Sequence, residues 1–538
     1  MKRYINILMV ALATMMTSCL TEDPRDQLYE EDIYNNANNI YINAVAVLYN
    51  YIGGSADSEG LQGTCRGIYD YNTLTTDEAM IPIRGGDWYD GGLWTNMYQH
   101  KWSPNDLPLY NTWKYLYKVV VLSNKSLHII DKYSHNLSEE QRVAYEAEVR
   151  ALRALFYYYI MDMYGRVPIV TSYEQPQDEV VQSERSEVFR FIVNELQEVA
   201  ELLPNERSNK MGNYYGRITT PVANFLLAKL ALNAEIYCDD NWTDGVPRNG
   251  KEIFFTVDGE KLNAWQTCIK YCNKLAEVGY RLEDDYSYNF SVHNENSNEN
   301  IFTIPLDKNL YAAQFWYLFR SRHYNHGGAL GGSSENGTSA NISTVLANGY
   351  GTDDVDARFE KNFYAGIVEV DGKPVMMDNG QQLEYFPLEL KLNLTGSPYV
   401  KTAGARMAKY EVDRTSHSDG RQPDNDIVLF RYADALLMKS EAKVRNGEDG
   451  SLELNEVRGR VGMPYREATL ENILKERLLE LVWEGWRRQD MVRFGVYHKS
   501  YDQRVQLADE KNGYTTVFPI PQKSIDLNPK LKQNVGYK

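Results

Sequence analysis

After its first 20 residues the chain has no hydrophobic run of transmembrane length, since a membrane-spanning helix needs about 20 consecutive apolar residues. Positive charge is also scarce. There are 57 Lys and Arg against 74 Asp and Glu, a formal net charge of −17. Nucleic acids and anionic lipid headgroups are therefore poor partners, because like charges repel. The net charge does not argue against binding of neutral ligands.

Cysteine is rare, with five in 538 residues. Cys268 and Cys272 lie four residues apart in a helical pattern, without the His or carboxylate companions and the spacing of a zinc site. We therefore expect these two cysteines to be buried free thiols.

Motifs of catalysis are missing as well. The chain has no G-x-x-x-x-G-K-[ST] phosphate loop, no H-E-x-x-H and no G-x-S-x-G. Asp353, Asp354 and Asp356 lack the turn glycine and the closing glutamate of a calcium loop. We predict no metal, no cofactor and no catalytic residue. A secreted glycoside hydrolase stays an alternative, because such an enzyme needs only two carboxylates, which no motif reveals.

The amino terminus has the pattern of an export signal. Lys2 and Arg3 precede an apolar run over residues 5–16, and Ser18 and Cys19 follow. This order predicts a lipoprotein signal peptide over 1–18, acylation of Cys19 and a tether over 19–28. Two or more acyl chains would anchor the mature chain stably in a membrane. The alternative is an ordinary secretory signal with an incidental cysteine.

Apolar residues recur at intervals of three and four over much of the next 250 residues, which is typical of amphipathic helices. Ser138 and Gln141 form a capping box at the start of one of them, and Pro221 stands in the first turn of another. The predicted helices cover about 138–164, 186–203, 220–236 and 263–279. Such a series resembles a degenerate tetratricopeptide array, whose helix pairs bury their apolar faces against neighbouring pairs.

The helical periodicity lapses between about 284 and 425, where Asn, Gly, Ser and Tyr are frequent and only short extended pieces such as 301–304 occur. Helices are expected again over 427–444 and 470–491. We therefore predict an all-α fold with a large irregular, loop-rich insertion. Residues 29–538 would form one domain in three parts: a helical part (29–283), the insertion (284–425) and a carboxyl-terminal helical part (426–538).

Segment 76–102 combines aromatic rings with charged side chains. Trp88 and Trp94 lie among glycines and aspartates, away from any periodic apolar face, and Tyr89 is beside them. A sugar presents a face of C–H groups that packs on an aromatic ring. Its hydroxyls would suit Asp77, Asp87 and Arg84 as hydrogen-bonding partners.

A second aromatic group, Trp316, Tyr317 and Tyr324, lies in the irregular region. The whole chain has 41 Tyr and 9 Trp but only 16 Phe, so rings with a polar group dominate, as on wet binding surfaces. These rings could instead hold loops onto the scaffold. As a set they favour a ligand-binding surface.

Several segments together resemble the SusD/RagB family. The run from Phe430 to Leu437, F-R-Y-A-D-A-L-L, is similar to that family, and so is E-V-R-A-L-R-A from Glu148 to Ala154. The similarity also includes residues 77–94, 164–168, 441–442, 454–462, 476–495, 519–521, 528–529 and 533–534.

This resemblance implies a tetratricopeptide-like, all-helical lipoprotein of the outer membrane that faces the cell exterior. It implies that the protein binds oligosaccharides without chemistry and delivers them to a SusC-like TonB-dependent barrel. In the amino-terminal stretch it assigns Asp77 and Arg84 to hydroxyl groups of the ligand, and either Trp88 or Trp94 to stacking. A peptide-importing relative with the same scaffold is the alternative.

Overall fold

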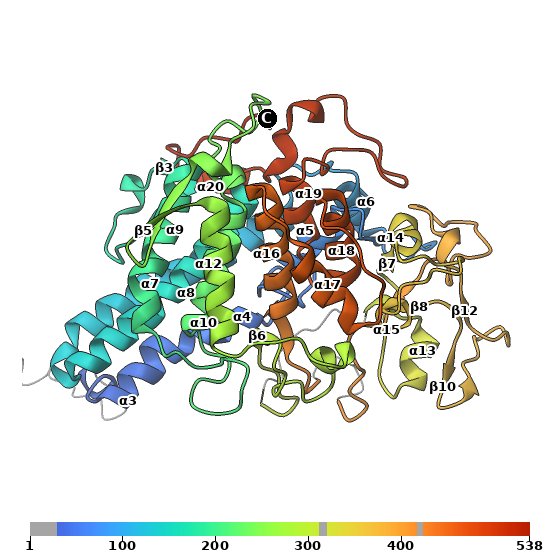
Figure 1. Ribbon diagram of the computed structural model, residues 1–538, viewed down its shortest axis with the longest axis horizontal. Coiled ribbons are helices and arrows are strands. Elements are labelled where there is room, and N and C mark those ends of the chain that lie inside the picture. The colour runs from blue at the N-terminus through green and yellow to red at the C-terminus, as the bar shows by residue number, and fades with distance from the viewer. Residues whose placement is uncertain (1–29, 311–319, 417–422, 538) are drawn as a thin grey trace, which may run out of the picture.

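The computed structural model describes residues 30–310, 320–416 and 423–537, which form a mostly helical protein (Figure 1). The predicted fold class is confirmed. Among the described residues no helix is both long enough and apolar enough to cross a membrane. Cys19 and the tether over 19–28 lie outside the described residues, so lipidation stays a prediction.

Five long helices build the amino-terminal part, on the left and in the centre of Figure 1. They are α7 (Leu107–Lys132), α8 (Glu139–Tyr164), α9 (Arg185–Val199), α10 (Thr220–Leu232) and α12 (Ala264–Glu277). α7 packs on α8, α8 on α9 and α10 on α12. Each helix thus buries its apolar face against a neighbour, as expected for an array of helix pairs.

Local sequence signals place several of these helices correctly. α8 begins at the predicted capping box, in which Ser138 and Gln141 bond each other's backbone N–H, and it ends at Gly165 with a φ of 69°. α12 begins with a second capping box at Asn263. Cys268 and Cys272 on α12 are buried free thiols, which confirms that expectation.

The carboxyl-terminal part differs from the prediction at its start. Residues 427–431 form strand β14 (Ile427–Arg431), which pairs antiparallel with β6 (Asn300–Ile304), and the helix α16 begins only after it (Tyr432–Asn446). The predicted helix from residue 427 is therefore wrong for five residues. All residues of both strands are buried, and a short continuous apolar run does not distinguish a buried strand from a helix.

The single helix predicted over 470–491 is also wrong. The structure has two helices instead, α18 (Leu470–Leu481) and α19 (Arg487–Arg493), separated by residues 482–486. Trp483 and Gly485 between them have positive φ angles of 69° and 73°, which an α-helix does not contain. The spacing of Leu474, Leu478, Leu481, Val482 and Gly485 continues across this break, so periodicity alone predicts one helix.

The remaining elements are short. The helices are α2 (Glu30–Ile33), α3 (Ala37–Ile40), the π-helix η1 (Tyr41–Ala46), α4 (Val47–Gly53), α5 (Ile68–Leu74), α6 (Leu93–Tyr98), α11 (Ala234–Tyr237), α13 (Tyr324–Ala329), α14 (Ile342–Ala347), α15 (Phe359–Asn362), α17 (Ser451–Arg460) and α20 (Gln522–Leu527). The strand pairs are β1 (Ala79–Met80) with β7 (Ser339–Ala340), β2 (Val167–Pro168) with β3 (Gln182–Ser183), β4 (Phe254–Val257) with β5 (Glu260–Asn263), β8 (Phe363–Tyr364) with β13 (Arg406–Met407), β9 (Gly366–Ile367) with β12 (Glu384–Tyr385), and β10 (Glu369–Val370) with β11 (Lys373–Pro374).

The insertion folds against the amino-terminal segment that carries Trp88. β7 of the insertion pairs with β1, and Ile83 forms a further bridge with Asn393. In Figure 1 the part of the insertion that contains α13, β10 and β12 lies on the right, away from α7 and α9, whereas β6 lies near the centre. The segment 79–94 is thereby held between the insertion and the helical body.

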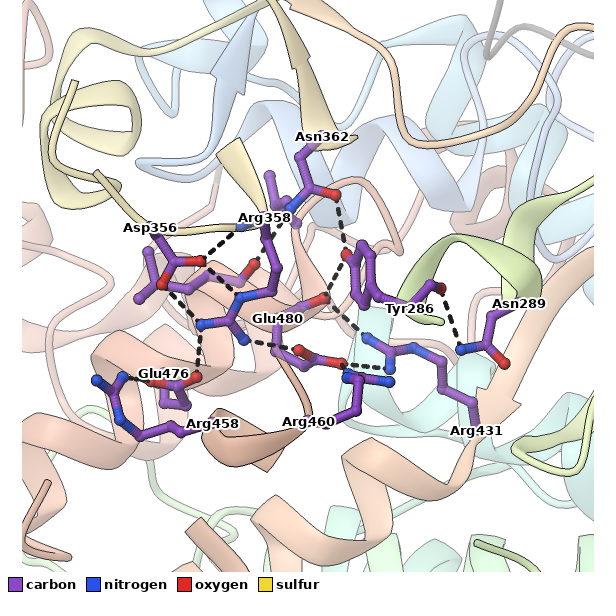
Figure 2. Close-up of polar contacts among 12 residues, drawn as sticks. Tyr286, Asn289, Asp356, Arg358, Asn362, Arg431, Arg458, Arg460, Glu476 and Glu480 are labelled. Carbon is purple, nitrogen blue, oxygen red and sulfur yellow. Dashed lines mark hydrogen bonds and ion pairs between the residues drawn. The ribbon is translucent and has the colours of Figure 1, made fainter. Parts of the chain in front are cut away.

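A buried network of ion pairs joins the insertion to the carboxyl-terminal helices (Figure 2). Arg358 of the insertion bonds Glu476 and Glu480 of α18, each at 2.6 Å. Arg431 at the end of β14 bonds the other oxygen of Glu480 at 2.6 Å. Arg460 of α17 also bonds Glu480. These side chains are at most 4% exposed.

The charges in this network compensate the cost of their burial. Burial alone raises the pKa of Glu480, but the guanidinium groups of Arg460, Arg431 and Arg358 hold it well below the ordinary value. Glu480 is therefore ionised at neutral pH. A buried ion that loses its partner is strongly destabilising, because its desolvation is no longer offset.

We expect Arg358→Met to lower the free energy of unfolding by about 3 to 5 kcal/mol, because it removes the cation shared by Glu476 and Glu480. Urea unfolding followed by circular dichroism measures this. Arg414→Met is the matched control, since Arg414 forms an exposed ion pair with Asp371 and its loss should not change stability measurably. Equal unfolding midpoints for the two variants would contradict the role given to the network.

Candidate functional site

The loop between Arg84 and α6 has a strained backbone. Trp88 and Asp90 both adopt positive φ angles, 61° and 41°, and Gly91 and Gly92 follow with 65° and 88°. Glycine adopts this region freely, whereas other residues there cost about 1 to 3 kcal/mol each and cluster at binding sites. The loop 85–92 is therefore a candidate for function on its conformation alone.

Trp88 is half-buried and held in place by the insertion. Its indole Nε1 donates to the carbonyl oxygen of Glu335 at 3.0 Å, and its ring packs edge-to-face on Trp94 with centroids 5.9 Å apart. Gly337 lies directly beside the ring, where a Cβ atom would come within 2.6 Å of Cζ2. The orientation of Trp88 thus depends on a glycine almost 250 residues away.

Exposed polar and aromatic groups meet on one side of the loop. Asp87 accepts hydrogen bonds from Lys401 Nζ at 2.7 Å and from the Tyr324 hydroxyl at 3.0 Å. Lys401 Nζ lies 5.4 Å from the centroid of the Tyr324 ring. The side chain of Asp87 is 46% exposed and Tyr324 is 40% exposed. Tyr89 nearby in the loop is 57% exposed.

The protonation states of this group are well defined. The hydrogen bond from Lys401, with a second from Tyr324, lowers the pKa of Asp87. Partial burial and the contact with Asp87 raise the pKa of Tyr324 to about 12. At neutral pH Asp87 is therefore a carboxylate and Tyr324 a protonated phenol.

A small cleft of about 460 Å³ lies on the other side of the loop. Arg66 bonds Asp90 at 2.9 Å and Asp57 at 2.6 Å, and all three side chains are about one-third exposed. Asn96, Asn105 and Asp106 complete the polar lining. Hydrogen-bonding groups thus border the loop on both sides.

Trp94 does not have the exposure that stacking on a ligand requires. It is 1% exposed, and its Nε1 donates to Asp90 at 2.7 Å. The guanidinium groups of Arg66 and Arg320 each lie 5.5 Å from the centroid of its ring. The expectation that Trp94 could stack on a ligand is therefore wrong, because Trp94 lies on α6 with its ring buried in the core. Of the two tryptophans, Trp88 is the one that is partly exposed.

Arg84 is also buried, at 1% exposure, and burial lowers its pKa well below the ordinary value. Its guanidinium donates to Ser339 Oγ at 2.8 Å and to the Ala403 carbonyl at 2.9 Å, so it fastens the segment to the insertion. Asp77 accepts two hydrogen bonds of 2.7 Å from Arg487 of α19. Both side chains are anchors in this structure, which does not fit the expected contacts with ligand hydroxyls.

The remaining predicted residues, Trp316 and Tyr317, lie outside the described residues. Sequence reasoning missed Lys401, because no motif surrounds it and 314 positions separate it from Asp87. It also missed Arg66, which joins Asp57 to Asp90. In the described ranges no cluster of three or more His, Cys, Asp or Glu side chains is arranged to hold a metal ion.

Two family models match the chain on either side of the central region. One, described as the SusD family, matches residues 332–537. The other, described as starch-binding and associating with the outer membrane, matches residues 32–232. The chain is also 25% identical to the starch-binding protein SusD of Bacteroides thetaiotaomicron, over 90% of this chain and 89% of that protein. It belongs to the SusD/RagB family.

Other similar proteins have the same overall extent. A SusD-like protein of Formosa agariphila, P25, is 24% identical, with 96% of each chain covered. Surface glycan-binding protein A of Bacteroides thetaiotaomicron, solved in complex with laminarihexaose, superposes with a TM-score of 0.69 at 20% identity, over 92% of this chain and 99% of that one. A laminarin-binding SusD-like protein gives a TM-score of 0.67 over 93% and 100%. At these identities the structural matches establish the fold.

We expect Gly337→Ala to displace Trp88, because the new Cβ would clash with its ring, at a cost of about 1 to 3 kcal/mol. Near-ultraviolet circular dichroism and tryptophan fluorescence report the displacement. Gly459→Ala on α17 is the control, since a Cβ there meets nothing within 4 Å. A spectrum of Gly337→Ala identical to that of the parent protein would contradict the contact.

Proposed function

We propose that this protein captures oligosaccharides at the cell surface and delivers them to a SusC-like TonB-dependent barrel in the outer membrane, without catalysing a reaction. The mature chain would be anchored through acylated Cys19. Membership of the SusD/RagB family supports this, as do the starch-binding relative and the relative solved with laminarihexaose.

One observation carries the proposal: an exposed aromatic face and hydrogen-bonding groups converge beside loop 85–92. Trp88 and Tyr324 offer ring surface, while Asp87 and Lys401 offer an acceptor and a donor for hydroxyl groups. A sugar ring combines an apolar C–H face with hydroxyl edges, so this combination of groups suits it. The single carboxylate and the single ammonium group pair with each other, which favours a neutral glycan.

Binding at this surface should be weak for a short ligand. Each hydroxyl exchanges hydrogen bonds with water for hydrogen bonds with protein, and the net gain per bond is only about 0.5 to 1.5 kcal/mol. A polymer that contacts several sites, or several proteins on one cell, gains through effective concentration. Weak sites are thus compatible with efficient capture of polysaccharides.

We expect the double variant Trp88→Ala/Tyr324→Ala to lose at least about tenfold in affinity, because each truncation removes a ring from the surface. Retardation in polysaccharide gels, after a glycan array has identified the ligand, measures this on the chain that starts after Cys19. Tyr465→Ala is the control, an exposed tyrosine on another part of the surface.

Three results would contradict the proposal. The parent protein could bind no glycan, it could bind peptides instead in calorimetry, or the purified protein could release sugar from a labelled oligosaccharide. The last result would identify a hydrolase.

We expect Cys19→Ala to abolish labelling of the protein by a fatty-acid analogue and to move it from the membrane fraction to the soluble fraction, because the acyl chains supply the anchor. Fractionation of cells expressing each form tests this. Cys65→Ala is the control, since Cys65 is buried. Membrane retention of the Cys19→Ala variant would show that another element anchors the chain.

A further inference from the structure

A groove of about 800 Å³ lies between the amino-terminal part and the start of the insertion. One wall comes from η1, α4 and the turn that follows α4. The other comes from residues 215–217 and from the end of β6. Four tyrosines contribute to the lining: Tyr41, Tyr49 and Tyr51 on the first wall and Tyr215 on the second. None of the residues of loop 85–92 takes part, so the groove is separate from the surface described above.

Glu148 fixes two of the three tyrosines on the first wall, Tyr41 and Tyr49. Its carboxylate accepts hydrogen bonds from the hydroxyls of Tyr49 at 2.5 Å and Tyr41 at 3.3 Å, and from Arg217 at 2.6 and 2.9 Å. The guanidinium of Arg217 lies 4.8 Å from the centroid of the Tyr41 ring. The polar ends of these side chains are thus satisfied within the protein, and what the rings can offer a ligand is their surface.

Tyr51 and the opposite wall of the groove are also held in place by contacts within the protein. The hydroxyl of Tyr115 donates to the backbone carbonyl of Tyr51, and Lys118 Nζ lies 4.6 Å from the centroid of the Tyr51 ring. Gly216, with a φ of 72°, packs so closely on Pro305 that a Cβ would come within 2.3 Å of its Cγ. The groove is therefore preformed, which lowers the entropic cost of binding.

Several polar side chains in the groove have no partner in the part of the chain that the structure describes. Asn50, Ser55 and Glu59 line it, and their side chains make no hydrogen bond or ion pair there with other described residues. Asn50 and Ser55 are exposed. An amide, a hydroxyl and a carboxylate, beside tyrosine rings and one lysine, supply both donors and acceptors with little net charge. Such a lining suits a neutral ligand rich in hydroxyl groups.

The groove is also connected to the first surface. The segment between α4 and α5 carries Ser55 and Glu59, and Asp57 between them bonds Arg66, which in turn bonds Asp90 of loop 85–92. One short segment therefore borders both the groove and the cleft beside the loop.

We propose that this groove is a second carbohydrate-binding site, in which Tyr41 and Tyr51 contact sugar rings while Asn50, Ser55 and Glu59 bond their hydroxyls. This inference rests on the proposed glycan-binding function. A neutral glycan long enough to reach both sites binds more tightly than a short one, because the second contact is intramolecular.

The test uses the polysaccharide that the glycan array identifies and a short oligosaccharide of the same sugar. Asn50→Leu removes an exposed side chain without an internal partner, and Tyr51→Ala removes a ring. We expect each variant to lose about three- to tenfold in affinity for the polysaccharide, while Tyr465→Ala keeps the parent value. Hydrogen exchange of residues 47–59 should slow when the polysaccharide is added.

The outcomes separate this inference from the proposed function. Residual binding by Trp88→Ala/Tyr324→Ala, with protection confined to residues 47–59, supports a second site. Parent-like affinity of both groove variants, with no protection of residues 47–59, overturns the second site while glycan binding itself stands. If the parent protein binds no glycan at all, both proposals fail. The Asn50→Leu variant keeps the test valid if Tyr51→Ala proves unstable.

Discussion

The buried pairing of Arg358 and Arg431 with Glu480 is the interaction on which the rest of this structure depends. It joins an insertion of irregular backbone to regular helices at a place where water is excluded, so each charge needs its partner. The candidate ligand surface is built across the same boundary. The amino-terminal segment supplies Trp88 and Asp87, while the insertion supplies the groups that position them, so docking of the insertion is a condition for the surface to exist.

Segment 76–102 divides its side chains between two roles. Arg84 and Trp94 are buried and hold the segment to its surroundings, whereas Asp87, Trp88 and Tyr89 are left partly or largely exposed. A strained loop needs such anchors, because its positive φ angles at Trp88 and Asp90 would relax without them. The exposed groups are thereby presented in one fixed arrangement, which suits the recognition of a weakly bound ligand.

Local sequence signals were sufficient to predict the regular helices but not the short strands and helix breaks. The capping boxes at Ser138 and Asn263 locate α8 and α12, because the atoms that form them lie within one turn. Strand β14 was mistaken for a helix, since its partner β6 is more than 120 residues away and the buried run has no alternation. The break at Trp483 was missed because its side chain fits an apolar helical face.

By itself the sequence determined the helical class and the family, and it predicts an export leader and the segment that carries the candidate site. Those features depend on short-range patterns and on combinations of motifs. Only the tertiary structure decided which side chains of that segment face the solvent. Trp88 and Trp94 have similar neighbours in sequence, yet Trp88 is half-exposed and Trp94 is buried beside two arginines. The difference comes from Gly337 and Glu335 beside Trp88 and from Arg320 beside Trp94, whose positions next to the segment exist only once the insertion has packed against it.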